Sequence, residues 1–295
     1  LTVRKMTVAI TVTEIKKLNL QNDFSSLSYK KPFEPFGTEP AIGDSLYLTH
    51  PELCTKQLDT LSLQFEWMNP PTSLKDYYAN YKTLAALPPV LTTETALITS
   101  NLDFKVNLSL VDKHSGISLQ ELNLFDVADA KTPKVASVNV KEKLAEKVPT
   151  FIYEQRIPDE EPPQEIQDAE RYWRLELKSP SFLDVYYPQL LTRQLLLDSK
   201  DPNKSLVLSP PYTPKLKTLT AGYTASFTLD LFDTKNNSTD HRLYHLHPFG
   251  YKELPVKTTD VSAMNLLLPD YTDEGELYLG ISGLNAPQSV SMLFQ

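Results

Sequence analysis

The stretch Met6-Thr7-Val8-Ala9-Ile10-Thr11-Val12-Thr13 alternates apolar side chains with threonines. A period of two places the apolar side chains on one face of a strand and the polar side chains on the other. Further stretches alternate in the same way, around residues 61–67, 102–110, 173–178 and 223–231. Such strands, separated by turns rich in proline and asparagine, are typical of antiparallel sheets packed face to face. The sequence therefore predicts a mainly β fold, an antiparallel β-sandwich (jelly-roll or Ig-like) with one or two short helices.

The opening stretch has a counterpart 213 residues further along the chain. The matches are Met6-Thr7 with Leu219-Thr220, Ile10-Thr11-Val12 with Tyr223-Thr224-Ala225, and Pro35-Phe36-Gly37 with Pro248-Phe249-Gly250. A constant offset keeps the parity of the strand, so the matching residues fall on the same face. Because a repeat is one structural unit used twice, we expect two homologous modules.

The repeat also predicts where the modules begin and end. We expect residues 1–214 to form a complete β-sandwich module, with an acidic, proline-rich loop inserted near residues 157–165. Residues 215–295 are expected to begin a second, homologous module that is truncated, so we interpret the chain as part of a longer protein. Between the two, Pro210-Pro211-Tyr212-Thr213-Pro214 has three prolines in five residues, which predicts a stiff connector.

The overall composition argues against several classes of function. The formal net charge is −8 and no basic cluster occurs, which disfavours nucleic-acid binding, since phosphate contacts need concentrated lysine and arginine. No apolar run reaches the roughly 18 residues of a membrane-spanning helix, and the first residues show no cleavable signal pattern, so we expect no membrane insertion. The single cysteine, Cys54, cannot form an internal disulfide or a cysteine-based metal site. Synthesis in the cytosol fits these features.

Two short helices are predicted within the β-rich chain. Residues 73–84 begin with Ser73 as an N-cap and carry tyrosines at helical spacing, and residues 188–197 begin with proline in the first turn. Tyr77, Tyr78 and Tyr81 could stack on a sugar, but at this spacing we favour packing of the helix against a sheet.

A histidine cluster is the one suggestive pattern for a metal. His241, His245 and His247 would share one face of a strand because their spacing is even, and three imidazoles could bind zinc. The interpretation that we favour is a polar strand edge, because Asp240 is the one nearby carboxylate and the first copy of the repeat lacks these histidines. We therefore predict no metal and no cofactor.

No catalytic motif stands out elsewhere in the sequence. Asp112-Lys113-His114-Ser115 places acid, base and hydroxyl side by side, but a catalytic triad is assembled in space, so we expect a hairpin turn closed by Gly116. The acids at 159–161 are interpreted as a solvated loop, and Cys54 as a small buried apolar residue. Nucleotide-binding loops, HExxH and nucleophile elbows are absent from the sequence, which predicts that the chain is not an enzyme.

Short motifs at strand ends and in loops carry a family resemblance that spans nearly the whole chain. They are Leu20-Gln21-Asn22-Asp23-Phe24, Lys31-Pro32-Phe33-Glu34-Pro35-Phe36-Gly37, Gly43-Asp44-Ser45-Leu46-Tyr47-Leu48, Tyr187-Pro188-Gln189-Leu190-Leu191-Thr192 and Pro210-Pro211-Tyr212-Thr213-Pro214. Together they resemble the large baseplate J-like wedge proteins of bacterial contractile injection systems, the phage-tail-like particles of the antifeeding prophage and Photorhabdus virulence cassette type.

This resemblance implies a structural role. In that family, six wedges surround a central hub and couple it to the sheath, so the expected partners are other baseplate subunits and sheath or hub proteins in a six-fold assembly. It also implies synthesis in the bacterial cytoplasm and assembly into a particle that can be released from the cell.

Two other classes of function stay open at the level of the sequence. A carbohydrate-binding or adhesin-like β-sandwich module would need exposed aromatic rings, for which Tyr77, Tyr78, Tyr186 and Tyr187 are the candidates. A hydrolase decorated by β modules would have its active site on another part of the protein.

Overall fold

The structure, a computed structural model, describes residues 5–91, 93–112, 116–146, 171–200, 206–230, 243–247 and 250–254. The chain divides into two compact units. The larger unit is Ala9–Phe227, and the smaller unit combines Leu1–Val8 with Thr228–Gln295. The larger unit holds nearly all of the described residues.

A four-stranded sheet forms one layer of the larger unit, in the order β1 (Lys5–Ile15), β10 (Leu216–Asp230), β5 (Thr60–Trp67), β8 (Lys134–Asn139). Strand β5 is antiparallel to both of its neighbours, with Leu63 opposite Ala221 of β10 and opposite Ala136 of β8. Leu61, Leu63, Phe65 and Trp67 are buried, while the residues between them are half-buried or exposed. The alternation expected from the sequence is thus confirmed residue by residue in this strand.

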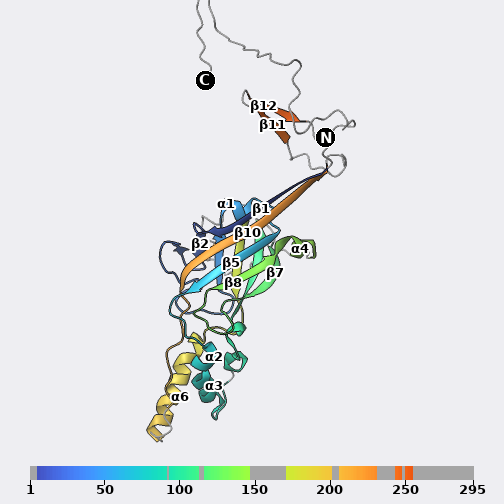
Figure 1. The fold of residues 1–295 in the computed structure, drawn as a ribbon. Coiled ribbons are helices and arrows are strands. Elements are labelled where there is room, and N and C mark those ends of the chain that lie inside the picture. Colours follow the sequence, from blue (N-terminus) through green and yellow to red (C-terminus); the bar gives the residue numbers. More distant parts are fainter. Residues whose placement is uncertain are drawn as a thin grey trace, which may run out of the picture. The chain divides into compact units, whose positions relative to one another are not determined.

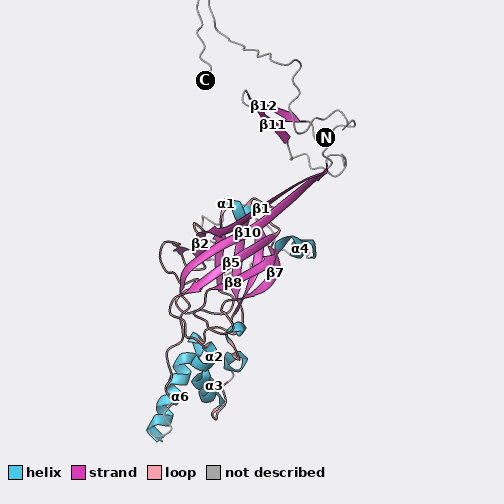
Figure 2. Ribbon diagram, in the orientation of Figure 1, coloured by secondary structure: helices cyan, strands magenta, loops and turns pink. Residues whose placement is uncertain are grey.

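A six-stranded antiparallel sheet forms the second layer (Figures 1 and 2). Its order is β3 (Ser26–Leu27), β2 (Asn19–Asn22), β4 (Ser45–Thr49), β9 (Arg171–Leu177), β6 (Lys105–Asp112), β7 (Gly116–Asn123). Strands β6 and β7 form the hairpin expected around Gly116, with Val111 opposite that glycine. Residues 113–115 of the predicted turn lie outside the described part of the chain.

The apolar faces of the two sheets contribute to a single hydrophobic core. Both tryptophans are almost fully buried in it, and each indole Nε1–H donates to a backbone carbonyl: Trp67 to Leu124 O at 2.7 Å and Trp173 to Leu53 O at 3.2 Å. Leu53 lies in the short helix α1 (Pro51–Cys54), and a second short helix, α4 (Val140–Glu146), follows β8. The predicted mainly antiparallel β fold is confirmed, with an architecture consistent with a β-sandwich.

Helices gather at one end of the sheets (Figure 1). They are α2 (Leu74–Tyr77), α3 (Ala79–Ala86) and α6 (Tyr187–Lys200), with the 3-10 turns η1 (Glu94–Leu97), η2 (Asn101–Asp103) and η3 (Asp184–Tyr186). Ser73 caps α2 as expected, because its hydroxyl accepts from Asp76 N at 3.1 Å. The guanidinium of Arg193 in α6 donates to the carbonyls of Leu84 and Leu87, where α3 ends. A cation at a helix C-terminus satisfies free carbonyls and favours the helix dipole, so α6 holds α3 in place.

The structural division of the chain differs from the predicted module boundary at residue 214. Strand β10 begins two residues later, yet it lies between β1 and β5, and Leu216, Leu219, Ala221 and Tyr223 are buried in the core. The larger unit extends to Phe227 because this strand completes its sheet. Residues 255–295, which would continue the predicted second module, lie outside the described residues.

The matched Pro-Phe-Gly triplets have different surroundings. In the smaller unit, β11 (Leu243–His247) and β12 (Gly250–Leu254) pair as an antiparallel hairpin on either side of Pro248-Phe249. In the larger unit, the first triplet lies in a loop, and Phe33 just before it makes an isolated bridge to Leu216. Hairpin arms therefore flank the second triplet alone among the described residues.

Candidate protein-interaction site

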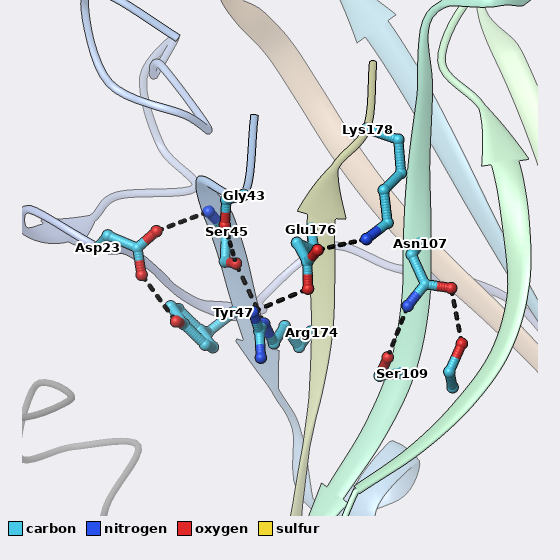
Figure 3. Close-up of polar contacts among 10 residues, drawn as sticks. Asp23, Gly43, Ser45, Tyr47, Asn107, Ser109, Arg174, Glu176 and Lys178 are labelled. Carbon is cyan, nitrogen blue, oxygen red and sulfur yellow. Dashed lines mark hydrogen bonds and ion pairs between the residues drawn. The ribbon is translucent and has the colours of Figure 1, made fainter. Parts of the chain in front are cut away.

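Three of the five family-like motifs meet around the turn that holds Asn22 and Asp23, between β2 and β3. The Asp23 carboxylate accepts two hydrogen bonds from β4, one from Ser45 N and one from the Tyr47 hydroxyl, each at 2.7 Å (Figure 3). Phe33, in the second motif, exchanges backbone hydrogen bonds with Leu216 at the start of β10. We call the residues 20–25, 31–37 and 43–48 the Asp23 cluster.

Asn22 fixes the turn that carries Asp23. Its side-chain Oδ1 accepts from Phe24 N at 3.0 Å and from Ser25 N at 2.7 Å, which is the local hydrogen bonding that lets asparagine close a turn. Its Nδ2 donates to Glu34 O at 3.0 Å and so ties this turn to the second motif. Asn22 is almost fully buried, so the turn has a defined conformation in the folded protein.

Phe24 projects from this fixed turn and is 65% exposed. Its ring packs over Gly37, whose φ is +78°, and a Cβ added there would lie 2.7 Å from the Phe24 ring. The positive φ therefore favours glycine at residue 37, and the absence of a side chain there leaves space for the Phe24 ring. Beside Phe24 lies a hollow of ≈ 710 Å³, with Ser26, Lys31, Phe33 and Glu39 in its wall. An exposed aromatic ring on a rigid turn beside a hollow is typical of an anchor residue in a protein interface.

A row of polar side chains extends from the cluster across the six-stranded sheet, on the face opposite the core (Figure 3). Arg174 Nε donates to Ser45 Oγ at 3.1 Å, and its Nη2 lies 2.8 Å from Glu176 Oε2. Lys178 pairs with the other oxygen of Glu176. Further along, Asn107 bonds both Ser109 and Ser118. Cations flank the Glu176 carboxylate and the hydrogen-bond donors in this row face acceptors, so the arrangement stabilises the sheet. It does not have the geometry of a nucleophile that is activated by a base.

The other two motifs meet at the helical end, where tyrosine hydroxyls hold residues 206–215. The Tyr77 hydroxyl donates to Pro210 O and the Tyr81 hydroxyl to Ser209 O, each at 2.6 Å. Tyr78 is 2% exposed, donates to Phe182 O at 2.9 Å and accepts from Tyr212 N at 3.1 Å. The stretch predicted to be a stiff connector is thus fastened to α2 and α3 by side-chain hydrogen bonds, and it is part of the larger unit.

Burial keeps these tyrosine hydroxyls protonated. Desolvation raises the pKa of Tyr78, Tyr81 and Tyr212 above the ordinary tyrosine value, so each stays a neutral donor. The Tyr187 ring stacks on Tyr81 with ring centroids 6.2 Å apart, and Tyr186 packs against the core. A sugar cannot stack on a ring as buried as Tyr78, whereas Tyr77, Tyr186 and Tyr187 are half-buried.

The sequence of the chain matches a known family of proteins. A family model described as "Baseplate protein PVC11-like" matches residues 5–295. The chain belongs to this family of baseplate proteins. A search of curated proteins gave no match. The predicted relationship to baseplate proteins of phage-tail-like systems is therefore confirmed at the level of the family.

Two of the three histidines of the predicted metal pattern lie in a described strand of this baseplate protein. His241 lies outside the described residues, while His245 and His247 lie in β11, opposite Lys252 and Gly250 of β12. In the described ranges, no group of three or more His, Cys, Asp or Glu side chains is placed to hold a metal ion. The acidic stretch 157–165 also lies outside those ranges. None of the helices described is long and apolar enough to cross a membrane.

Besides the tyrosines, burial raises the pKa of a thiol, Cys54, and of a carboxyl, Asp184. Cys54 packs against the core, partly buried, and desolvation raises the pKa of its thiol, in line with its expected apolar role. Desolvation also raises the pKa of Asp184 to about 6. One oxygen of that carboxyl is buried and has no hydrogen-bond partner within the described residues. The sequence offered no signal for Asp184, because its burial depends on residues distant in the chain.

Phe24 is the residue of most functional interest that sequence reasoning passed over. Phe24 lies in one of the five family-like motifs, but the sequence did not predict that its ring is exposed. A usable signal existed: an Asn-Asp pair before an aromatic residue, followed 13 residues later by a glycine with room for the ring.

Proposed function

We propose that this chain is a structural scaffold component of a phage-tail-like contractile injection particle, a baseplate wedge subunit that acts through protein–protein contacts. The observation that carries the proposal is the match to baseplate proteins over residues 5–295. The resemblance of the five motifs, in the Asp23 cluster and in residues 187–192 and 210–214, to J-like wedge proteins adds to it. In this role six copies surround the hub and contact the sheath or hub proteins, and the chain catalyses no reaction.

The two clusters support a role in assembly. Wedge subunits need a rigid body with exposed anchor residues, and Phe24 is exposed on a turn fixed by Asn22 and Asp23. We further propose that the protein is made in the bacterial cytoplasm and is assembled into a particle that can be released from the cell. The carbohydrate-binding alternative loses support because Tyr78 is buried.

Purification of particles from cells that carry a tagged copy of this gene tests the proposal. We expect the tagged chain to co-purify with sheath and tube proteins at six copies per particle, and we expect deletion of the gene to abolish intact particles. A chain that is absent from purified particles, or a deletion that leaves particle yield unchanged, would refute the wedge role.

A matched pair of variants tests the anchor. Phe24→Asp should lower incorporation into particles several-fold without changing the melting temperature, because the ring is mostly exposed. Val90→Asp, at a residue 71% exposed in a loop after α3, is the control and should incorporate normally. Equal incorporation of the two variants into particles would show that Phe24 is not an interface residue.

A further inference from the structure

Strand β1 lies at an edge of the four-stranded sheet, and none of the described residues forms a strand along its outer side. It pairs with β10 on one side, and no other described strand pairs with it (Figure 1). Ala9, Ile10, Thr11 and Thr13 are exposed, and Ile10 keeps 44% of its surface accessible. The backbone groups on the outer side of such a strand are a row of donors and acceptors that matches another strand.

The other edge strands carry the features that usually block pairing. Strand β3 has two residues, and β8 follows Pro133 and begins with Lys134. Strand β7 has exposed Gln120 and Glu121 side by side. By contrast, residues 6–13 of β1 include neither a charge nor a proline. Because an unguarded edge of β-branched residues invites association, a strand in this position is expected to be covered in the working assembly.

A basic hollow lies at the end of β1 and suggests what the covering segment carries. The hollow measures ≈ 640 Å³ and its wall includes Lys16, Lys17 and Lys30 beside Tyr29. Its two carboxylates are already engaged: Glu14 pairs with Lys16 at 3.0 Å, and Glu66 pairs with Lys217 at 2.6 Å. Lys17 and Lys30 have no carboxylate partner among the described residues, and the Lys30 ammonium lies over the Tyr29 ring, 5.9 Å from its centroid. Two positive charges without a paired anion thus lie in this hollow, in a protein of net charge −8.

We propose that the outer edge of β1 is a strand-addition site for an extended segment of another protein subunit. This segment has an uncharged centre that alternates apolar and hydroxyl side chains, and an acidic residue at the end that reaches Lys17 and Lys30. Main-chain hydrogen bonds along residues 9–13 supply the affinity, and the lysines set direction and register. The inference rests on the proposed scaffold role, since it names one of the surfaces through which that role is exerted.

A second copy of β1 is the less suitable occupant. Antiparallel pairing of two copies about Ile10 and Thr11 would set Lys5 of each strand opposite Lys16 of the other. Like charges directly opposite each other destabilise a pair of strands, and both basic hollows would be left without an anion. The free lysines therefore point to a different, acidic partner.

Photo-crosslinking within assembled particles tests the inference. Thr11→p-benzoyl-phenylalanine should cross-link to one segment of a different subunit that has an acidic residue near the cross-linked site. The control carries the same photo-reactive residue at Val135, which is 55% exposed on the edge strand β8, and it should give no such product. A product between two copies of this chain, or no product at Thr11 in particles that contain the chain, overturns the inference and leaves the scaffold role standing. Particles without the chain refute the scaffold role itself.

Two charge variants of the full chain provide an independent measurement. Ile10→Lys and the double variant Lys17→Glu with Lys30→Glu should each lower incorporation into particles by about tenfold, equivalent to ~1.4 kcal/mol of contact free energy. Their melting temperatures should match that of the unchanged protein, because all three side chains are exposed or half-exposed at the surface. Normal incorporation of both variants overturns the inference.

Discussion

Strands β1 and β10 resemble each other in sequence and differ in what surrounds them. Ile10 of β1 and Tyr223 of β10 are equivalent in the repeat, yet Ile10 is 44% exposed and Tyr223 is 2% exposed. The difference arises because β10 has a neighbour on both sides, whereas β1 has one. A period-two pattern thus determines which face of a strand is apolar, and the position of the strand in the sheet determines how much of that face is buried.

Deletion of β10 and deletion of β1 should show the largest difference between the two strands in their contribution to stability. A chain that ends at Pro214 lacks β10 and loses the buried side chains of Leu216, Leu219 and Tyr223. At about 1.5–3 kcal/mol for each large buried side chain, together with an unpaired β5, this loss is comparable to the roughly 5–15 kcal/mol that stabilises a domain. We expect no cooperative thermal transition from this shortened chain.

The matched deletion removes β1 and should have a smaller effect. A chain that begins at Glu14 keeps β10, β5 and β8 and should unfold cooperatively at a lower temperature, measured by circular dichroism. Cooperative unfolding of the chain that ends at Pro214 would contradict the central place of β10 and would favour the module boundary predicted from the sequence.

Alanine at the two equivalent residues is the next largest test. Tyr223→Ala should lower the free energy of unfolding by about 3–5 kcal/mol, as for other large aromatic residues removed from a core. Ile10→Ala should lower it by less than about 0.5 kcal/mol, because the side chain is already solvated. Urea unfolding of both variants provides the measurement, and equal losses at the two residues would show that β1 is as buried as β10.

These differences mark how far the sequence could predict the fold. Alternation is a local property, so β5 could be predicted with its buried face correct at every residue. The place of a strand within a sheet depends on partners far away in the chain, and the repeat, which gives β1 and β10 the same pattern, contains no information on it. The larger unit extends to Phe227 for this reason, because a strand that starts a repeat can still complete the preceding sheet, and the division into two modules at residue 214 stays a prediction.

The candidate site was predictable only in part. The motifs of the Asp23 cluster could be recognised in the sequence. The hydrogen bond from Asn22 to Glu34 could not be predicted from it, because the bond joins two separate motifs. The same holds for the proline-rich stretch 210–214, where composition predicts a connector and the Tyr77 hydroxyl, 133 residues away, fastens it to α2. Tyrosine hydroxyls reach backbone carbonyls wherever packing brings them together, and composition does not report such contacts.

The close approach of β1 to β10 can be tested at Gly222 and at its equivalent in the repeat, Ala9. A Cβ at residue 222 would lie 2.8 Å from Ser62 Oγ and 2.9 Å from Val12 O, and the carbonyl cannot rotate away. Gly222→Ala should therefore cost about 1–3 kcal/mol, in the range of overpacked sites. Ala9→Gly should cost no more than roughly 0.5–1 kcal/mol, the usual penalty for glycine in a strand. A neutral or stabilising Gly222→Ala, measured by urea unfolding, would show that β1 does not approach β10 this closely.

The smallest effect concerns the Tyr223 hydroxyl, which has no counterpart at Ile10. It donates to Glu52, and Lys56 Nζ donates to it at 2.9 Å. The hydrogen bond from Tyr223, followed by that from Lys56, lowers the pKa of Glu52 below its ordinary value of 4.5. A carboxyl whose pKa is lower in the folded state contributes stability above its unfolded pKa and loses that contribution as the pH falls through its folded pKa.

Tyr223→Phe removes this hydroxyl and keeps the ring. We expect a lower free energy of unfolding near pH 7, where the hydroxyl donates to ionised Glu52, and a smaller loss at an acid pH low enough to protonate Glu52 in the folded state as well. Urea unfolding at both pH values measures the difference, and Ile10→Val is the matched control that should show no pH-dependent change. An equal loss for Tyr223→Phe at the two pH values would mean that the hydroxyl acts through packing and not through Glu52, and the contrast between the two strands would then be one of burial alone.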